Sequence, residues 1–239
     1  MRLGVLYGIV LGLALLTAGC NAMPGDPRSG PPIPPDQVTD FHILYNRNCQ
    51  ACHGANGRNG PAIDLANPEY EALIDDTTLR RIVANGMPGT EMPAWAQSAG
   101  GMLTDAQVNA LVAGMRREWA RPNAFAGGTP PPYAQNQTGD AKRGQQTYQA
   151  RCASCHHTPA HQQVTSPVYL SLVSDQMLRT LIIAGRPDIR QPDWRHDTPN
   201  GGAGQPLSAQ DVTDIVAYLH ALRNPDEVSA APLSNAPRR

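Results

Sequence analysis

Lysine is almost missing from this sequence, and its charges are balanced. Lys142 is the only lysine among 19 basic residues, which face 20 acidic residues for a net charge of −1. Proteins that bind nucleic acids normally carry a basic excess, so no nucleic-acid partner is expected. The lack of lysines also argues against a docking surface built from a ring of lysine side chains.

Aromatic residues are also scarce, at 5% of the chain with only two phenylalanines. The length of 239 residues favours one or two domains. Small domains bury a small fraction of their surface, so two of them with few large apolar side chains would be marginally stable. A large apolar cofactor in each core would make up for this deficit.

The first 20 residues stand apart from the rest. A positively charged start is followed by residues 3–16, which are apolar or glycine, and Cys20 follows three small residues. This stretch is too short for a comfortable membrane span and indicates a secretory signal. Its end resembles the bacterial lipoprotein signal, in which the cysteine is lipidated, although Thr17 stands where leucine is usual. Residues 1–20 are predicted to be a signal peptide with Cys20 as the lipidation site. The alternatives are an uncleaved helix and ordinary cleavage into the periplasm, and all three export the chain.

Proline and glycine mark the boundaries between the remaining parts. Residues 21–36 and 121–138 are rich in both and are predicted to be an extended tether and a linker. The tail, residues 224–239, is rich in proline, serine and alanine and is predicted to be disordered. Two domains are therefore expected, at residues 37–120 and 139–223.

These two segments repeat one another. The offset between matching residues is 99 through most of the repeat and 103 at a cysteine motif that both copies contain. A repeat of this length indicates a duplicated domain, since solenoid units are shorter. The matching pairs are Pro68 and Pro167, Leu79 and Leu178, Gly86 and Gly185, Pro93 and Pro192, and Trp95 and Trp194.

The residue pattern inside each repeat is helical. Residues 77–85 predict a short amphipathic helix, and Thr104 with Gln107 forms a capping box before a longer one. Ser208 begins the second copy of that longer helix. No segment shows the alternation of a strand, so the fold class is predicted to be all-α, with two tandem helical domains.

The five cysteines are fully accounted for by Cys20 and two C-x-x-C-H motifs. Two thiols on one helical turn can bond to the vinyl groups of a porphyrin, and the histidine that follows is the fifth ligand of its iron. A zinc half-site would need further ligands at matched spacing, and a redox dithiol would not need the histidine twice. Two covalent haem c groups are therefore predicted, at Cys49, Cys52 and His53 and at Cys152, Cys155 and His156.

The motifs and repeats resemble the class I cytochromes c, over nearly all of residues 37–120 and 138–223. In that family a loop supplies a distal methionine before a proline, which implies Met92 as the sixth ligand of the first haem. The family holds the ring of the proximal histidine with a proline carbonyl, which implies Pro61 as the partner of His53. Two further methionines, Met87 and Met102, are expected to pack in the core.

The second repeat departs from the family at the distal position, where Gln191 aligns with Met92. Three alternatives stay open. In the first, Gln191 ligates or faces the iron. In the second, another side chain does so, either His196 or the weaker candidate His161. In the third, the iron is five-coordinate or binds water as its sixth ligand. A hard or absent sixth ligand should lower the potential of the second haem below that of the first.

The sequence therefore predicts an electron carrier rather than an enzyme. Lipid-anchored on the outer side of a bacterial cell membrane, it would pass electrons from a quinol-oxidising complex or dehydrogenase to a terminal oxidase or similar acceptor. A tether raises the effective concentration of such partners. The alternative function is a peroxidase or gas-binding centre at the second haem, should its distal site be open.

Overall fold

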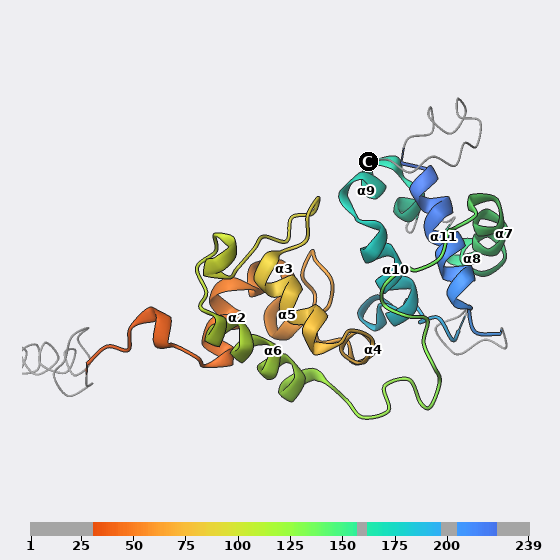
Figure 1. The fold of residues 1–239 in the computed structure, drawn as a ribbon. Helices are drawn as coiled ribbons and strands as arrows, with labels where there is room; N and C mark the ends of the chain where they lie inside the picture. Colours follow the sequence, from red (N-terminus) through yellow and green to blue (C-terminus); the bar gives the residue numbers. More distant parts are fainter. Residues whose placement is uncertain (1–30, 157–161, 197–204, 224–239) are drawn as a thin grey trace, which may run out of the picture. The chain divides into compact units, whose positions relative to one another are not determined.

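The computed structural model describes residues 31–156, 162–196 and 205–223 (Figure 1). The chain divides into two units, Met1–Val38 and Thr39–Arg239, so both repeats belong to one compact unit. We call residues 39–120 the N-lobe and residues 139–223 the C-lobe. The predicted signal with Cys20, most of the tether, His161 and the tail lie outside the described residues, and the predicted domain boundaries stay predictions.

The N-lobe is built from five α-helices. Short polar side chains begin most of them. Asp40, Asp75 and Thr104 each accept a hydrogen bond from a backbone N–H of the first turn, and the expected Thr104–Gln107 capping box is present. The helices are α2 (Phe41–Asn48), α3 (Gln50–His53), α4 (Pro68–Leu73), α5 (Asp76–Asn85) and α6 (Asp105–Trp119).

The C-lobe repeats this order with α7 (Ala141–Arg151), α8 (Ala153–His156), α9 (Pro167–Leu172), α10 (Asp175–Ala184) and α11 (Ala209–Ala221). Ser208 caps α11 in a second capping box. The described residues contain two isolated bridges but no strand, so the all-α prediction is confirmed. Within this described part, no helix is both long and apolar enough to cross a membrane.

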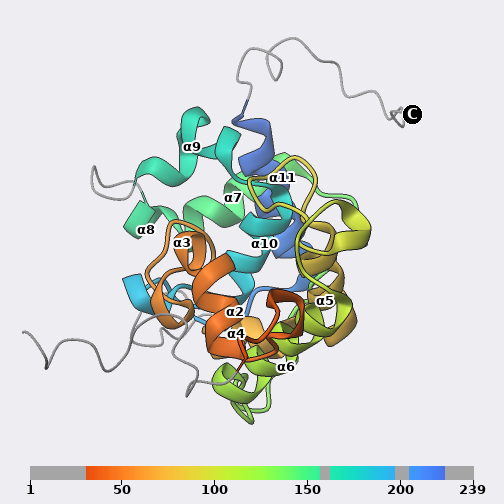
Figure 2. The ribbon, with the colours of Figure 1, turned by 90° about the vertical axis from the view of Figure 1, so that its left-hand side faces the viewer.

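In each lobe the first and last helices cross at close range. Figures 1 and 2 show α7 beside α11, and α2 packs on α6 in the same way. A Cβ atom on Gly114 of α6 would overlap the ring of Phe41, and one on Gly144 of α7 would overlap the backbone of Asp214. Gly144 aligns with Phe41, so this position holds a large residue in the N-lobe and glycine in the C-lobe. The glycine at the crossing lies on the last helix in the N-lobe and on the first helix in the C-lobe.

One arginine in each lobe ties the last helix to the end of the helix pair before it. Arg116 donates to the carbonyl groups of Glu71 and Ile74 and pairs with Asp76. In the C-lobe, Arg223 donates to two carbonyl groups and pairs with one acid. Each of these partners lies 99 residues after the corresponding partner of Arg116. These partners are Leu170 at 2.8 Å, Val173 at 2.7 Å and Asp175 at 2.7 Å.

Candidate functional site

The two C-x-x-C-H motifs form turns with the same hydrogen bonds. The Cys49 N–H donates to the Tyr45 carbonyl at 2.8 Å, and the His53 N–H donates to the Cys49 carbonyl at 3.0 Å. The C-lobe repeats both distances, from Cys152 to Tyr148 and from His156 to Cys152. Each turn thus presents two thiols and an imidazole from one short stretch of backbone.

The ring of His53 is buried and held in one orientation. It is 8% exposed, and its Nδ1 lies 2.9 Å from the Ile63 carbonyl, so Nδ1 carries the proton and Nε2 keeps its lone pair. Burial lowers the pKa of this imidazole, with the Ile63 hydrogen bond opposing it, which favours the neutral form that a metal needs. The expected partner, the Pro61 carbonyl, is wrong: the loop places the carbonyl two residues further on within reach.

The first thiol of each motif is poorly suited to dithiol redox chemistry. Burial raises the pKa of Cys49 to about 12 and that of Cys152 to about 11, whereas the attacking species in thiol exchange is a thiolate. None of the four motif cysteines forms a disulfide in the described part of the chain, and Cys52 and Cys155 are exposed. The turns therefore fit permanent attachment of a group better than a reversible disulfide.

The N-lobe loop after α5 brings two thioethers to the core. Gly86 ends α5 with φ 68°, and the Met87 N–H then donates to the Met92 carbonyl at 3.0 Å, closing the loop. Met87 and Met92 are both partly buried against the N-lobe core. Met102 was expected to pack there too, but it is 70% exposed, because the turn before α6 directs it away from the core.

The C-lobe loop keeps this frame with a different side chain. Gly185 has φ 67°, and the Arg186 N–H donates to the Gln191 carbonyl at 3.0 Å. Gln191 therefore occupies the backbone position of Met92. Its Nε2 donates to the Leu181 carbonyl of α10 at 2.9 Å, so one end of the amide is anchored on the helix and Oε1 is the end left for a metal.

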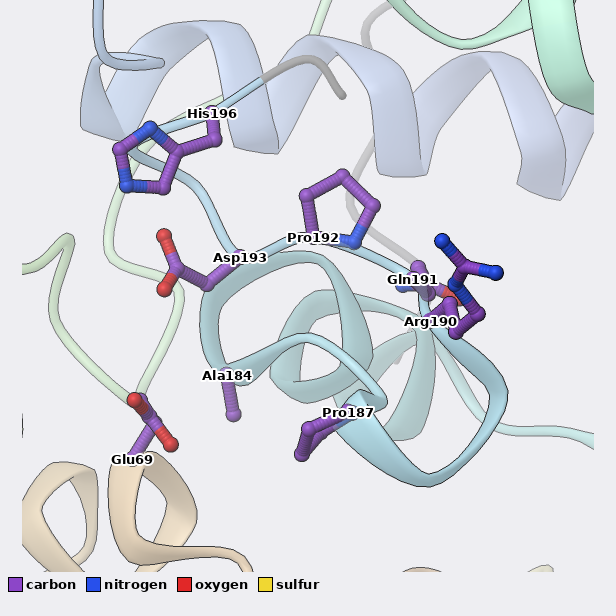
Figure 3. Close-up of a pocket in the computed structure, with 8 residues that line it drawn as sticks. All are labelled: Glu69, Ala184, Pro187, Arg190, Gln191, Pro192, Asp193 and His196. Atoms are coloured by element: carbon purple, nitrogen blue, oxygen red, sulfur yellow. The ribbon is translucent and has the colours of Figure 1, made fainter. Parts of the chain in front are cut away.

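His196 lies elsewhere on the loop. It is exposed and lines a pocket that also contains Gln191, Asp193 and, from α4, Glu69. Figure 3 shows His196 beside Asp193, on the opposite side of Pro192 from Gln191. The structure thus separates the two distal candidates of the C-lobe: Gln191 holds the position equivalent to Met92, and His196 is at the surface.

A buried donor in the C-lobe lacks a partner. The indole ring of Trp194 is 6% exposed, and its Nε1 has no hydrogen-bond acceptor in the described part of the chain. Buried N–H groups are almost always paired, so a missing group with acceptor atoms is expected beside it. The carboxylates of a haem fit this need.

Two family matches follow the repeat. Residues 36–113 match the family described as cytochrome c oxidase, cbb3-type, subunit III, and residues 141–223 match the family described as cytochrome c. The chain carries two tandem cytochrome c domains. Each binds one haem c covalently, so the predicted cofactors are confirmed.

One curated relative is similar to part of this chain. A dihydro-heme d1 dehydrogenase of Pseudomonas aeruginosa is 36% identical over 114 residues, which are 47% of this chain. The matched stretch is only 18% of that protein's length. No solved structure matches the chain at a significant level.

The chain's own residues account for how each haem would be held. The cysteines of each motif would form its two thioether bonds, and the following histidine would supply the proximal nitrogen. The Ile63 carbonyl would keep the His53 ring from turning, which raises the basicity of Nε2. The haem itself supplies one-electron exchange at its iron, and the loops after α5 and α10 determine what the other face meets.

Asp64, which follows Ile63, is a buried acid whose charge is poorly compensated. It is 2% exposed, and no well-formed hydrogen bond reaches either carboxylate oxygen in the described part of the chain. Burial raises the pKa of Asp64, and the charge of Arg58 and the backbone N–H of Ala66 oppose this only in part. The folded protein thus binds this proton more tightly than the unfolded chain, whose aspartates have a pKa of about 3.9. The stabilising effect is present below that value and is lost as pH rises through the folded pKa.

Asp64→Asn removes the buried charge and is therefore expected to be more stable than the parent protein at pH 7, by about 1 kcal/mol, since a pKa difference of one between the folded and unfolded states corresponds to about 1.4 kcal/mol. The difference should vanish near pH 3, where the carboxyl group is protonated in both states. Thermal unfolding of the haem-loaded proteins across this pH range measures it, with the exposed Glu91→Gln in the same lobe as control. A variant that loses stability at pH 7 would show that the folded protein needs the charged carboxylate.

Proposed function

We propose that the protein is a lipid-anchored di-haem electron carrier of the bacterial cell envelope. It accepts electrons from a quinol-oxidising complex or a dehydrogenase and delivers them to a terminal oxidase or a similar acceptor. The observation that carries this proposal is the pair of matching haem-attachment turns within one compact unit. The match of residues 36–113 to an oxidase subunit family supports an oxidase partner, and the dehydrogenase relative supports a dehydrogenase donor.

The proposed ligands differ between the lobes. Haem 1 is attached to Cys49 and Cys52 and takes His53 and Met92 as axial ligands. Haem 2 is attached to Cys152 and Cys155, and His156 is its proximal ligand. On its distal side, Gln191 is preferred to His196, because Gln191 shares the loop position of Met92 and His196 is exposed. Haem 1 is then the centre of higher potential.

A direct test uses membranes from cells that lack this protein. Purified oxidised holoprotein is added with a quinol, and the absorbance of its haems is followed under anaerobic conditions. Both haems should become reduced, and admission of oxygen should reoxidise them through a cyanide-sensitive oxidase. If neither quinol nor dehydrogenase substrates reduce the haems within the time of respiratory turnover, the carrier function is wrong.

Anchoring rests on Cys20, and its test is independent of redox activity. Cys20→Ser should move the protein from the membrane fraction to the soluble fraction released from the periplasm, with both haems retained. Metabolic labelling with a fatty acid should mark the parent protein and not the variant. An unlabelled parent that stays in the membrane would favour an uncleaved N-terminal helix instead.

A second candidate function follows from Gln191. Because its amide Nε2 is already bonded to Leu181, only Oε1 competes with an external ligand for the distal site. A weakly held site of this kind would let haem 2 bind a gas or peroxide. Addition of carbon monoxide to the reduced protein separates the two functions: binding at one haem supports the second, and two low-spin haems inert to carbon monoxide exclude it.

A further inference from the structure

Asn67 is a buried polar residue that bonds both lobes at once. It is 2% exposed. Its Oδ1 accepts from the backbone N–H groups of Glu69 at 2.8 Å and Tyr70 at 3.3 Å, at the start of α4. Its Nδ2 donates to the carbonyl groups of Ala184 at 3.2 Å and Gly185 at 3.1 Å, at the end of α10. One amide thus caps the N-terminus of a helix in one lobe and the C-terminus of a helix in the other.

Capping α4 does not by itself require asparagine. Serine, threonine and aspartate also supply the acceptor that a helix N-terminus needs. The residue at the matching place in the C-lobe is Ser166, and its side chain makes no capping bond to α9. Only a side-chain amide provides an acceptor and two donor hydrogens together, so the choice of Asn67 is explained by its bonds to Ala184 and Gly185.

The bonded carbonyl groups lie at the start of the loop that carries Gln191. Gly185 ends α10, and Arg186 and Gln191 then exchange two hydrogen bonds of 3.0 and 2.9 Å. On the other side, Asn67 is four residues from Ile63, whose carbonyl holds the His53 ring. Asn67 therefore joins the loop that orients the proximal ligand of haem 1 to the loop on the distal side of haem 2.

Other contacts lie in the same region. Arg195 reaches Glu69 at 3.5 Å, a long ion pair that water screens in part. Ala184 packs in the N-lobe core, and Arg179 and Gln176 of α10 each bond a carbonyl group of the linker at 2.9 Å. Among these contacts, the amide of Asn67 is the one that bonds backbone groups of both lobes.

We propose that Asn67 is a positioning residue for electron exchange between the two haem-bearing lobes, because it fixes the loop of Gln191 against the loop of Ile63. The inference rests on the proposed carrier function. In the exchange one electron leaves a ferrous iron in one lobe and reduces a ferric iron in the other, with no bond made or broken. Such transfer slows steeply when the centres separate or turn, so a fixed contact between the lobes determines its rate.

Asn67→Asp is the decisive variant. Aspartate has the same shape and keeps the acceptor, so α4 stays capped, but it loses both donor hydrogens and places a carboxylate against two carbonyl oxygens. The holoprotein should keep two haems and its helical content. After rapid partial reduction by a pulse of radiolytic electrons, equilibration between the haems should slow by about tenfold or more, as expected when reacting groups lose their fixed proximity and orientation.

Two further variants control for the added charge and for the position of the substitution. Asn67→Ser retains a capping oxygen without an amide donor and should slow the equilibration as well, so the result does not depend on the added charge. Ser166→Ala, at the matching place in the C-lobe, should leave the rate unchanged. Equilibration at the parental rate in both Asn67 variants would overturn this inference and leave the carrier function standing. Reduction of neither haem by quinol or dehydrogenase substrates would instead remove the carrier function itself.

Discussion

Replacing Cys152 and Cys155 together with alanine should leave one covalent haem per chain and unfold the C-lobe. The described core of this lobe contains ten buried apolar residues, against 18 in the cluster centred on the N-lobe. A small core of this size leaves little margin, since whole domains are stable by only about 5–15 kcal/mol. The indole N–H of Trp194 would also stay buried without an acceptor among the residues that the structure describes.

The measurement combines haem content with a map of the unfolded region. Haem per protein should fall from two to one, helical circular dichroism should decrease, and limited proteolysis should cut within α7–α11 but not within α2–α6. Replacement of Cys49 and Cys52 is the matched control, and we expect it to remove haem 1 while the larger N-lobe core keeps more of its helices. A double variant at Cys152 and Cys155 that retains a protected C-lobe would contradict the dependence on haem.

Helix positions and the attachment motifs could be predicted from sequence because they depend on local signals. Thr104 with Gln107 and Ser208 with Asp211 both form the capping boxes that their spacing implies. The C-x-x-C-H spacing likewise determines which side chains share a turn. Fold class and cofactor follow from these local patterns together with the duplication.

Contacts between distant backbone groups could not be predicted in this way. The carbonyl that holds His53 belongs to Ile63 rather than Pro61, and this depends on the path of a loop whose glycine and asparagine residues permit several conformations. Nothing in the sequence around Asn67 indicates a partner in the other lobe, and only the packing of α4 near the end of α10 gives its Nδ2 atom two acceptors. Neither contact leaves a periodic pattern.

Alignment of the repeats also misplaces one structural role. By their N-caps, Thr104 and Ser208, the last helices match at an offset of 104, so Arg116 aligns with His220. Yet Arg223, one turn further on, bonds the carbonyl groups that match the partners of Arg116. A long arginine side chain reaches the same acceptors from either turn, so the contact is preserved while the position is not.

Gln191→Met is expected to raise the reduction potential of haem 2 by on the order of 100 mV, part of the roughly 0.8 V range that axial ligands determine. The frame for a methionine is already present. Gly185 and Gly86 share the same φ, the loops close through bonds of 3.0 Å, and a proline follows each distal residue. A thioether favours Fe(II), whereas an amide oxygen or water does not, so the substitution stabilises the reduced state.

A spectroelectrochemical titration that resolves the two haems measures this shift. Met92→Gln is the reciprocal variant and should lower the potential of haem 1 by a similar amount, which brings the potentials of the two haems closer together. His196→Ala is the control, because His196 is exposed and lies on the opposite side of Pro192 from Gln191. If His196→Ala shifts the potential of haem 2 and Gln191→Met does not, His196 is the distal ligand. If both haems of the parent protein titrate together at high potential, the proposed difference between the two distal sites is wrong.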